Sequence, residues 1–155
     1  MAEKKSIKHF KIDVVTLELK RNDPIVVCEE PMNDKFTVIN LLQSKIANSD
    51  REIFVVLCLN TKGYITSYHE SHVSTLNQSI IHPREVFKSA IISNASRIII
   101  GHNHPSGDVT PSSQDLMVTK TLVKAGKIID IPVLDHIIVS PREAISLREK
   151  YNQLF

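Results

Sequence analysis

The chain has 155 residues, 42% of them hydrophobic, and a formal net charge of only +2. This length and composition predict one globular domain with an apolar core. No apolar run approaches the roughly 20 residues that a membrane helix needs. No apolar segment follows the basic start of the chain, as a secretory signal would require. We therefore expect a cytoplasmic protein that does not enter a membrane.

Positive charge is concentrated at the start of the chain, where residues 1–21 carry six Lys or Arg against three Asp or Glu. A nucleic-acid-binding domain normally shows a stronger basic surface. The favoured interpretation is therefore a solvated start of the chain, with residues 1–11 forming a mobile segment before a domain over residues 12–155. DNA binding is weakly supported and stays open.

Strand-like and helix-like patterns alternate along the chain. β-Branched runs predict strands, and apolar side chains at helical spacing predict helices. In the first half of the chain we expect strands over 12–19 and 25–28, a helix over 34–47, and a hairpin of strands 51–59 and 64–69. In the second half we expect a helix from Pro83 to about Asn94, a strand over 97–100, and a helix over about 113–125 with Gly126 as its left-handed stop. One or two strands within 128–139 and a short helix within 143–151 complete the chain. Cys58 falls in the apolar run 53–59, which favours a buried free thiol over a disulfide with Cys28. The pattern predicts one layered α/β or α+β domain.

The chemistry-bearing stretch follows the strand at 97–100. His102 and His104 are two residues apart, so in extended backbone their side chains point to the same side while Asn103 faces away. Asp115 follows after a loop rich in Pro, Ser and Gly, in the first turn of the predicted helix. Two imidazoles and one carboxylate suit Zn²⁺ with its fourth position open, which is the catalytic rather than the structural pattern.

A simpler interpretation exists for part of this stretch. Ser112 and Asp115 have the spacing of a capping box, in which an N-cap Ser is matched by an acidic residue three positions later. The two interpretations are compatible, because Ser112 can cap the helix and also line a site.

The local sequence motifs also resemble those of a known family. His102-x-His104, followed after ten intervening residues by Asp115 with Ser112 three positions before it, resembles the JAMM motif of MPN/JAB metalloproteases. The stretches 82–87, 102–107 and 134–137 resemble the RadC-like branch of that superfamily. The resemblance spans about residues 12–150 and implies the JAB-type domain alone, without the helical N-terminal region of full-length RadC proteins.

This resemblance carries specific expectations. It implies a cytidine-deaminase-like α/β sandwich with a mixed central sheet flanked by helices. It also implies one Zn²⁺ per chain held by His102, His104 and Asp115. Glu52 would be the glutamate that activates the metal-bound water as general base, and Ser112 would hydrogen-bond the developing oxyanion. Glu85 is the second candidate for the base.

Other polar residues stay open. Asp135 or His136 could orient a ligand histidine from a second strand, and a satisfied core pair is at least as plausible for them. His9, His69, His72 and His82 are interpreted as non-ligands, with His82 structural at its helix start.

Two classes of function follow from these residues. The first is a zinc metallopeptidase or isopeptidase acting on a peptide or protein substrate. The second is a non-hydrolytic, zinc-stabilised module that binds DNA or a protein, in keeping with the family's association with DNA repair. A deaminase would need a Pro-Cys-x-x-Cys arrangement, which two isolated cysteines cannot supply. The substrate and the oligomeric state are not encoded in any motif of the sequence.

Overall fold

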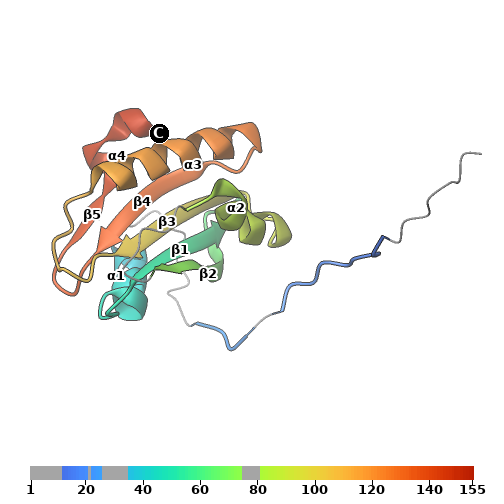
Figure 1. Ribbon diagram of the computed structural model, residues 1–155, viewed down its shortest axis with the longest axis horizontal. Coiled ribbons are helices and arrows are strands. Elements are labelled where there is room, and N and C mark those ends of the chain that lie inside the picture. The colour runs from blue at the N-terminus through green and yellow to red at the C-terminus, as the bar shows by residue number, and fades with distance from the viewer. Residues whose placement is uncertain (1–11, 21, 26–34, 75–80) are drawn as a thin grey trace, which may run out of the picture.

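The computed structural model describes residues 12–20, 22–25, 35–74 and 81–155. Its elements alternate as the sequence pattern predicts (Figure 1). They are α1 (Lys35–Ile46), β1 (Glu52–Leu59), β2 (Ile65–Ser74), α2 (Pro83–Ile92), β3 (Arg97–Asn103), α3 (Ser113–Ile128), β4 (Val133–Val139), β5 (Ala144–Ser146), α4 (Leu147–Lys150) and the short 3-10 helix η1 (Asn152–Leu154).

The strands form one mixed five-stranded sheet in the order β2-β1-β3-β4-β5. β1 is antiparallel to both β2 and β3, β3 is parallel to β4, and β4 is antiparallel to β5. A parallel pair needs a crossover connection, and α3 supplies it between β3 and β4. The first turn of α3 therefore lies beside the carboxyl end of β3, where ligands collect in α/β sheets.

Helices cover both faces of the sheet, and each face has its own core (Figure 1). Alternate residues of β1 point to opposite faces, so Phe54, Val56 and Cys58 pack with α2 and α3. Val55, Leu57 and Leu59 pack with α1 on the other face. The expected α/β sandwich with a mixed sheet flanked by helices is confirmed. Cys58 is a buried free thiol, as expected, and Cys28 lies outside the described residues.

The strand expected over residues 12–19 is wrong. Residues 12–19 form no regular structure and run away from the sheet (Figure 1), with Val14 97% exposed. β-Branched side chains favour a strand only where a neighbouring strand and a packed face are available, and no described strand pairs with this segment. Of the second expected strand, Ile25 packs against the α1-side core, and residues 26–28 lie outside the described residues, as does the segment 1–11.

The end of α3 corrects a second expectation. The helix runs past Gly126 to Ile128, and the left-handed residue is Asp130, with φ of 58°. The Ile131 N–H donates to the Gly126 carbonyl oxygen at 3.0 Å, which closes a Schellman-type end. Gly126 is needed for close packing instead, because a Cβ there would lie 2.6 Å from the Ile131 carbonyl oxygen.

Several boundaries also shift. β2 and β3 extend beyond their predicted ends to Ser74 and Asn103, and the region 128–139 holds the single strand β4. The short helix predicted within 143–151 is reduced to α4, because residues 144–146 pair with β4 as β5. No helix among the described residues is long and apolar enough to cross a membrane.

Candidate metal centre

The three predicted ligands come from two adjoining elements. His102 belongs to β3, His104 follows the last residue of that strand, and Asp115 is in the first turn of α3. The His104 N–H donates to the Val139 carbonyl oxygen at 3.1 Å, which keeps the backbone extended beyond the strand end. The two histidine side chains therefore lie on one face, as their spacing predicts.

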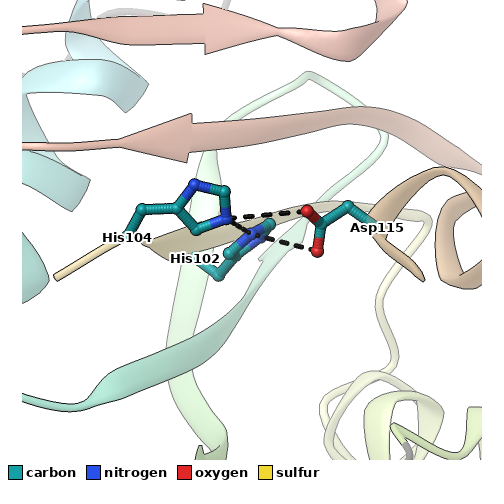
Figure 2. A group of neighbouring side chains, drawn as sticks. All are labelled: His102, His104 and Asp115. Carbon is teal, nitrogen blue, oxygen red and sulfur yellow. Dashed lines mark hydrogen bonds and ion pairs between the residues drawn. The ribbon is translucent and has the colours of Figure 1, made fainter. Parts of the chain in front are cut away.

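The donor atoms of these residues converge on one point (Figure 2). The Nε2 atoms of His102 and His104 are 3.0 Å apart. The Asp115 carboxylate oxygens lie 3.4 Å from His102 Nε2 and 3.5 Å from His104 Nε2. One ligand atom from each residue falls within 4.8 Å of the others, so the set could hold a metal ion.

The hydrogen bonds of each imidazole decide which of its ring nitrogens carries a proton and which is free to bind a metal. The Thr119 hydroxyl donates its one hydrogen to the Asp115 carbonyl oxygen at 2.6 Å, so it must accept from His136 Nδ1, also at 2.6 Å. Burial lowers the pKa of His136 well below its ordinary value, so its Nε2 carries no proton and accepts from His102 Nδ1 at 2.8 Å. His102 Nε2 is left with a bare lone pair facing the convergence point.

His104 is oriented in the same sense. Its Nδ1 lies 2.7 Å from the Asp108 carbonyl oxygen, which can only accept, so Nδ1 carries the proton. The hydrogen bond with Asp115 raises the pKa of His104. Its Nε2 therefore holds either a proton or a metal ion at the convergence point. Two ring nitrogens turned toward one carboxylate are a donor set that fits Zn²⁺.

Burial and charge set the remaining ionisation states. Burial lowers the pKa of His102 to about 4, so this ligand stays neutral at ordinary pH. Burial alone would raise the pKa of Asp115, but its hydrogen bonds with His104 and Ser112 and the nearby His102 hold that pKa below the usual range. Neutral imidazoles and an ionised carboxylate are the forms that bind a metal.

Glu52 is placed beside this centre. It opens β1 and lines the same cavity, of about 370 Å³, as His104, Ser112 and Asp115. Burial, followed by the charge of Asp115, raises the pKa of Glu52 above its ordinary value. Asn103 holds the backbone on both sides of it, because its amide donates to the Arg51 carbonyl oxygen at 2.9 Å and accepts from the Ile53 N–H at 2.8 Å.

Ser112 both caps a helix and lines the candidate site, as the sequence allowed. It is the N-cap of α3 in a complete capping box with Asp115, and it lines the cavity. Its hydroxyl donates to Asp115 Oδ2 at 2.7 Å. An oxyanion would have to take over that hydrogen, so the oxyanion role of Ser112 stays a prediction. In this structure its hydroxyl orients the Asp115 carboxylate.

The remaining candidates lie elsewhere. Glu85, the second candidate for the base, sits on the exposed face of α2 with Lys88 Nζ 2.8 Å from its carboxylate, away from the cavity lining. His82 is the N-cap of α2 without a side-chain cap, and His69 is exposed on β2. His9 lies outside the described residues.

Asp135 and His136 have different roles, because one supports the backbone and the other orients a histidine of the candidate site. Only His136 reaches a ligand, through His102 Nδ1. Asp135 is a structural carboxylate that accepts from Ser146 Oγ at 2.6 Å and from the His136 and Arg148 backbone N–H groups. Sequence reasoning missed Thr119 and Asp108, which fix the two ring orientations. Thr119 is four residues after Asp115, a spacing that places both on one helix face and is a usable signal.

Comparisons with known proteins show similarity over most of the chain. Residues 32–153 match a family model described as RadC-like JAB domain. The chain is 52% identical over 113 residues to the UPF0758 protein TTE0897 of Caldanaerobacter subterraneus subsp. tengcongensis, covering 73% of this chain and 48% of that protein. It is 44% identical over 113 residues to the UPF0758 protein Mbar_A2303 of Methanosarcina barkeri, covering 73% and 49%.

A further similarity covers more of this chain. A UPF0758 protein of Desulfitobacterium hafniense is 43% identical over 138 residues, which are 86% of this chain and 60% of the relative. This chain therefore spans about half the length of the first two relatives that it matches. Their printed names state no activity.

Proposed function

The chain belongs to the RadC-like JAB domain family, and from that premise we propose that it is a zinc-dependent hydrolase of peptide or isopeptide bonds. The observation that carries the proposal is that Glu52 lines the same cavity as His104 and Asp115, on the opening residue of a buried strand. A metal site that served only to hold the fold would need no carboxylate at its open side.

His102, His104 and Asp115 would hold the ion, one per chain. When bound, zinc supplies Lewis acidity, which acidifies water and polarises a substrate carbonyl. The protein's own part begins with orientation, because Ser112 fixes the Asp115 carboxylate and the hydrogen bonds of His136 and Asp108 fix the two rings.

Proton transfer falls to Glu52. Its carboxylate takes the proton of the attacking water as general base and returns it to the leaving amine as general acid. A raised pKa suits both halves of this exchange, because the ideal group for proton transfer has a pKa near the working pH. Phe54 and Ile81 line the cavity beside it and limit the access of other water.

The test compares Glu52→Gln with the parent after zinc loading. We expect loss of hydrolysis of a peptide and isopeptide panel by about 10²- to 10⁴-fold, the usual worth of general acid–base catalysis, with the zinc content unchanged. Glu85→Gln is the matched control, because Glu85 is paired with Lys88 outside the cavity. Unchanged activity in Glu52→Gln would overturn the assignment of the base.

The metal site is tested separately by zinc content. We expect about one zinc per chain in the parent and a sharp loss in His104→Ala and Asp115→Ala. A parent that binds no stoichiometric zinc after reconstitution would contradict the hydrolase proposal. The non-hydrolytic alternative, a zinc-stabilised DNA- or protein-binding module, predicts full zinc content and no hydrolysis by the parent itself.

A further inference from the structure

One histidine of the cavity has no role in the site described above. His72 lines the cavity together with Glu52 and His104. Among the buried side-chain nitrogen and oxygen atoms in the part of the chain that the structure describes, His72 Nε2 alone lacks a hydrogen-bond partner. Buried polar atoms are nearly always paired, and an exception at a cavity points to a partner that arrives from outside.

The strand register shows where this atom lies relative to the metal ligands. His72 on β2 is opposite Phe54 on β1, and Phe54 is opposite His102 on β3. Directly opposed residues of antiparallel strands point to the same face. The three side chains therefore form one row across the sheet. Two strand spacings of about 4.8 Å place the His72 backbone about 10 Å from that of His102, measured across the sheet.

Phe54 forms the floor between the two histidines. Its ring is stacked on that of His102, with centroids 6.0 Å apart and planes at 13°, and it lines the cavity. Glu52 is two residues before Phe54 and points to the same face. The cavity thus has an apolar floor, His104 and Asp115 at one end, and at the other the His72 side chain, whose buried Nε2 is unpaired.

These positions constrain how an amide substrate can lie. Its scissile carbonyl belongs at the convergence point of the ligands, and its leaving amine must face Glu52. The part of the substrate on the acyl side of the scissile bond then extends over Phe54 and toward His72. One residue on the acyl side spans about 3.8 Å between Cα atoms, so the next main-chain carbonyl comes within reach of the imidazole.

We infer that His72 is a substrate-binding residue whose Nε2–H donates a hydrogen bond to the first main-chain carbonyl oxygen on the acyl side of the scissile bond. This inference rests on the proposed hydrolase function and adds to it a preference for an acylated residue at that position. A free α-amine has no carbonyl there, so the site favours cleavage after an internal residue over removal of a single N-terminal residue.

The test is the binding of two zinc-directed probes to the zinc-loaded protein, measured by calorimetry without turnover. Acetohydroxamate contacts only the ion and its surroundings, whereas N-acetylalanine hydroxamate adds the carbonyl in question. We expect the parent to prefer the longer probe, and His72→Phe to weaken that probe alone by about 3- to 10-fold, the range of one net hydrogen bond.

Two further variants make the result specific. His72→Gln keeps an N–H donor at a similar reach and is expected to recover most of the preference, and His69→Phe, an exposed position on the same strand, is expected to leave it intact. An undiminished preference for N-acetylalanine hydroxamate in His72→Phe would overturn the role of His72. No binding of acetohydroxamate by the parent would instead overturn the metal centre, and this inference with it.

Discussion

The imidazole of His102 is held by groups that lie outside the candidate metal site. Its Nδ1 proton is accepted by His136, whose own Nδ1 proton is accepted by Thr119, which in turn donates to the backbone of the ligand Asp115. This series of hydrogen bonds joins β3, β4 and α3, so the orientation of one ligand is tied to the position of another. A change in His136 should therefore alter metal affinity without removing a ligand.

The expected effect of His136→Ala is a zinc affinity about 10- to 100-fold weaker, the usual cost of losing a partner of a ligand histidine. His136→Gln should recover much of the affinity, because its amide can accept from His102 and donate to Thr119. Competition with a chromophoric chelator measures both, with His69→Ala as the exposed control. Equal affinity for His136→Ala and the parent, with the fold intact by circular dichroism, would exclude this role.

The sequence predicts the residues that converge at the candidate metal site better than it predicts the groups that orient them. His102, His104 and Asp115 are recognisable because residue type and spacing limit where their side chains can go. Thr119 and Asp108 act through one hydroxyl and one backbone carbonyl, and any residue type supplies a carbonyl. His72 was set aside as a non-ligand; its unpaired nitrogen is visible only once β2 is paired with β1.

At the scale of the elements, α1, β1 and α2 lie within two residues of their predicted bounds, whereas β3 runs three residues beyond its predicted end. β1 was the strongest signal and is buried on both faces. Residues 12–19 have the same kind of side chains but pair with none of the strands that the structure describes, so local preference alone did not make a strand. Gly126 was assigned to a helix end by residue type, whereas its need for glycine comes from the chain that returns beside it.

Gly126→Ala provides a direct test of that packing. Alanine is the better helix former by about 1 kcal/mol, so a freely exposed site would be stabilised. Here the new Cβ would lie 2.6 Å from the Ile131 carbonyl oxygen and 3.2 Å from Phe87 Cζ. We expect overlap to dominate and the free energy of unfolding to fall by about 1–3 kcal/mol.

Denaturant unfolding measures this change. Lys124→Ala, at an exposed position of the same helix, is the matched control and should stay within about 0.5 kcal/mol of the parent. A Gly126→Ala variant that is more stable than the parent would show that the neighbouring chain gives way at little cost, and that close packing does not require glycine at this position.

At the scale of the whole molecule, the buried histidines of the candidate metal site make folding depend on pH even without a metal. Burial lowers the pKa of His102 to about 4 and that of His136 well below its ordinary value. Below about pH 6.5, the ordinary histidine pKa, the unfolded chain binds protons at these two rings that the folded chain does not. Their contribution to stability therefore falls as the pH falls.

His104, Glu52 and Asp135 change the stability with pH in the opposite direction. The hydrogen bond with Asp115 raises the pKa of His104, so its contribution is present at low pH and lost as the pH rises. Burial raises the pKa of Glu52 and of Asp135, and protons held by these folded carboxyls act in the same direction as that of His104. The pH dependence of the parent's stability therefore combines contributions that rise with pH and contributions that fall with pH. The contribution of one histidine is obtained only from the difference between the parent and a variant that lacks it.

His136→Gln supplies that difference, because glutamine keeps the hydrogen bonds and does not titrate. Thermal unfolding is compared between pH 7 and pH 5 in the presence of a chelator, so that metal binding adds no proton release of its own. We expect the parent to lose more stability on acidification than the variant, by up to about 1.4 kcal/mol per pH unit, the effect of one proton. An equal loss in both proteins would mean that His136 takes up a proton in the folded chain between pH 7 and pH 5, as it does in the unfolded chain. It could then not accept from His102, and the hydrogen bonds that orient that ligand would have to run in the opposite direction.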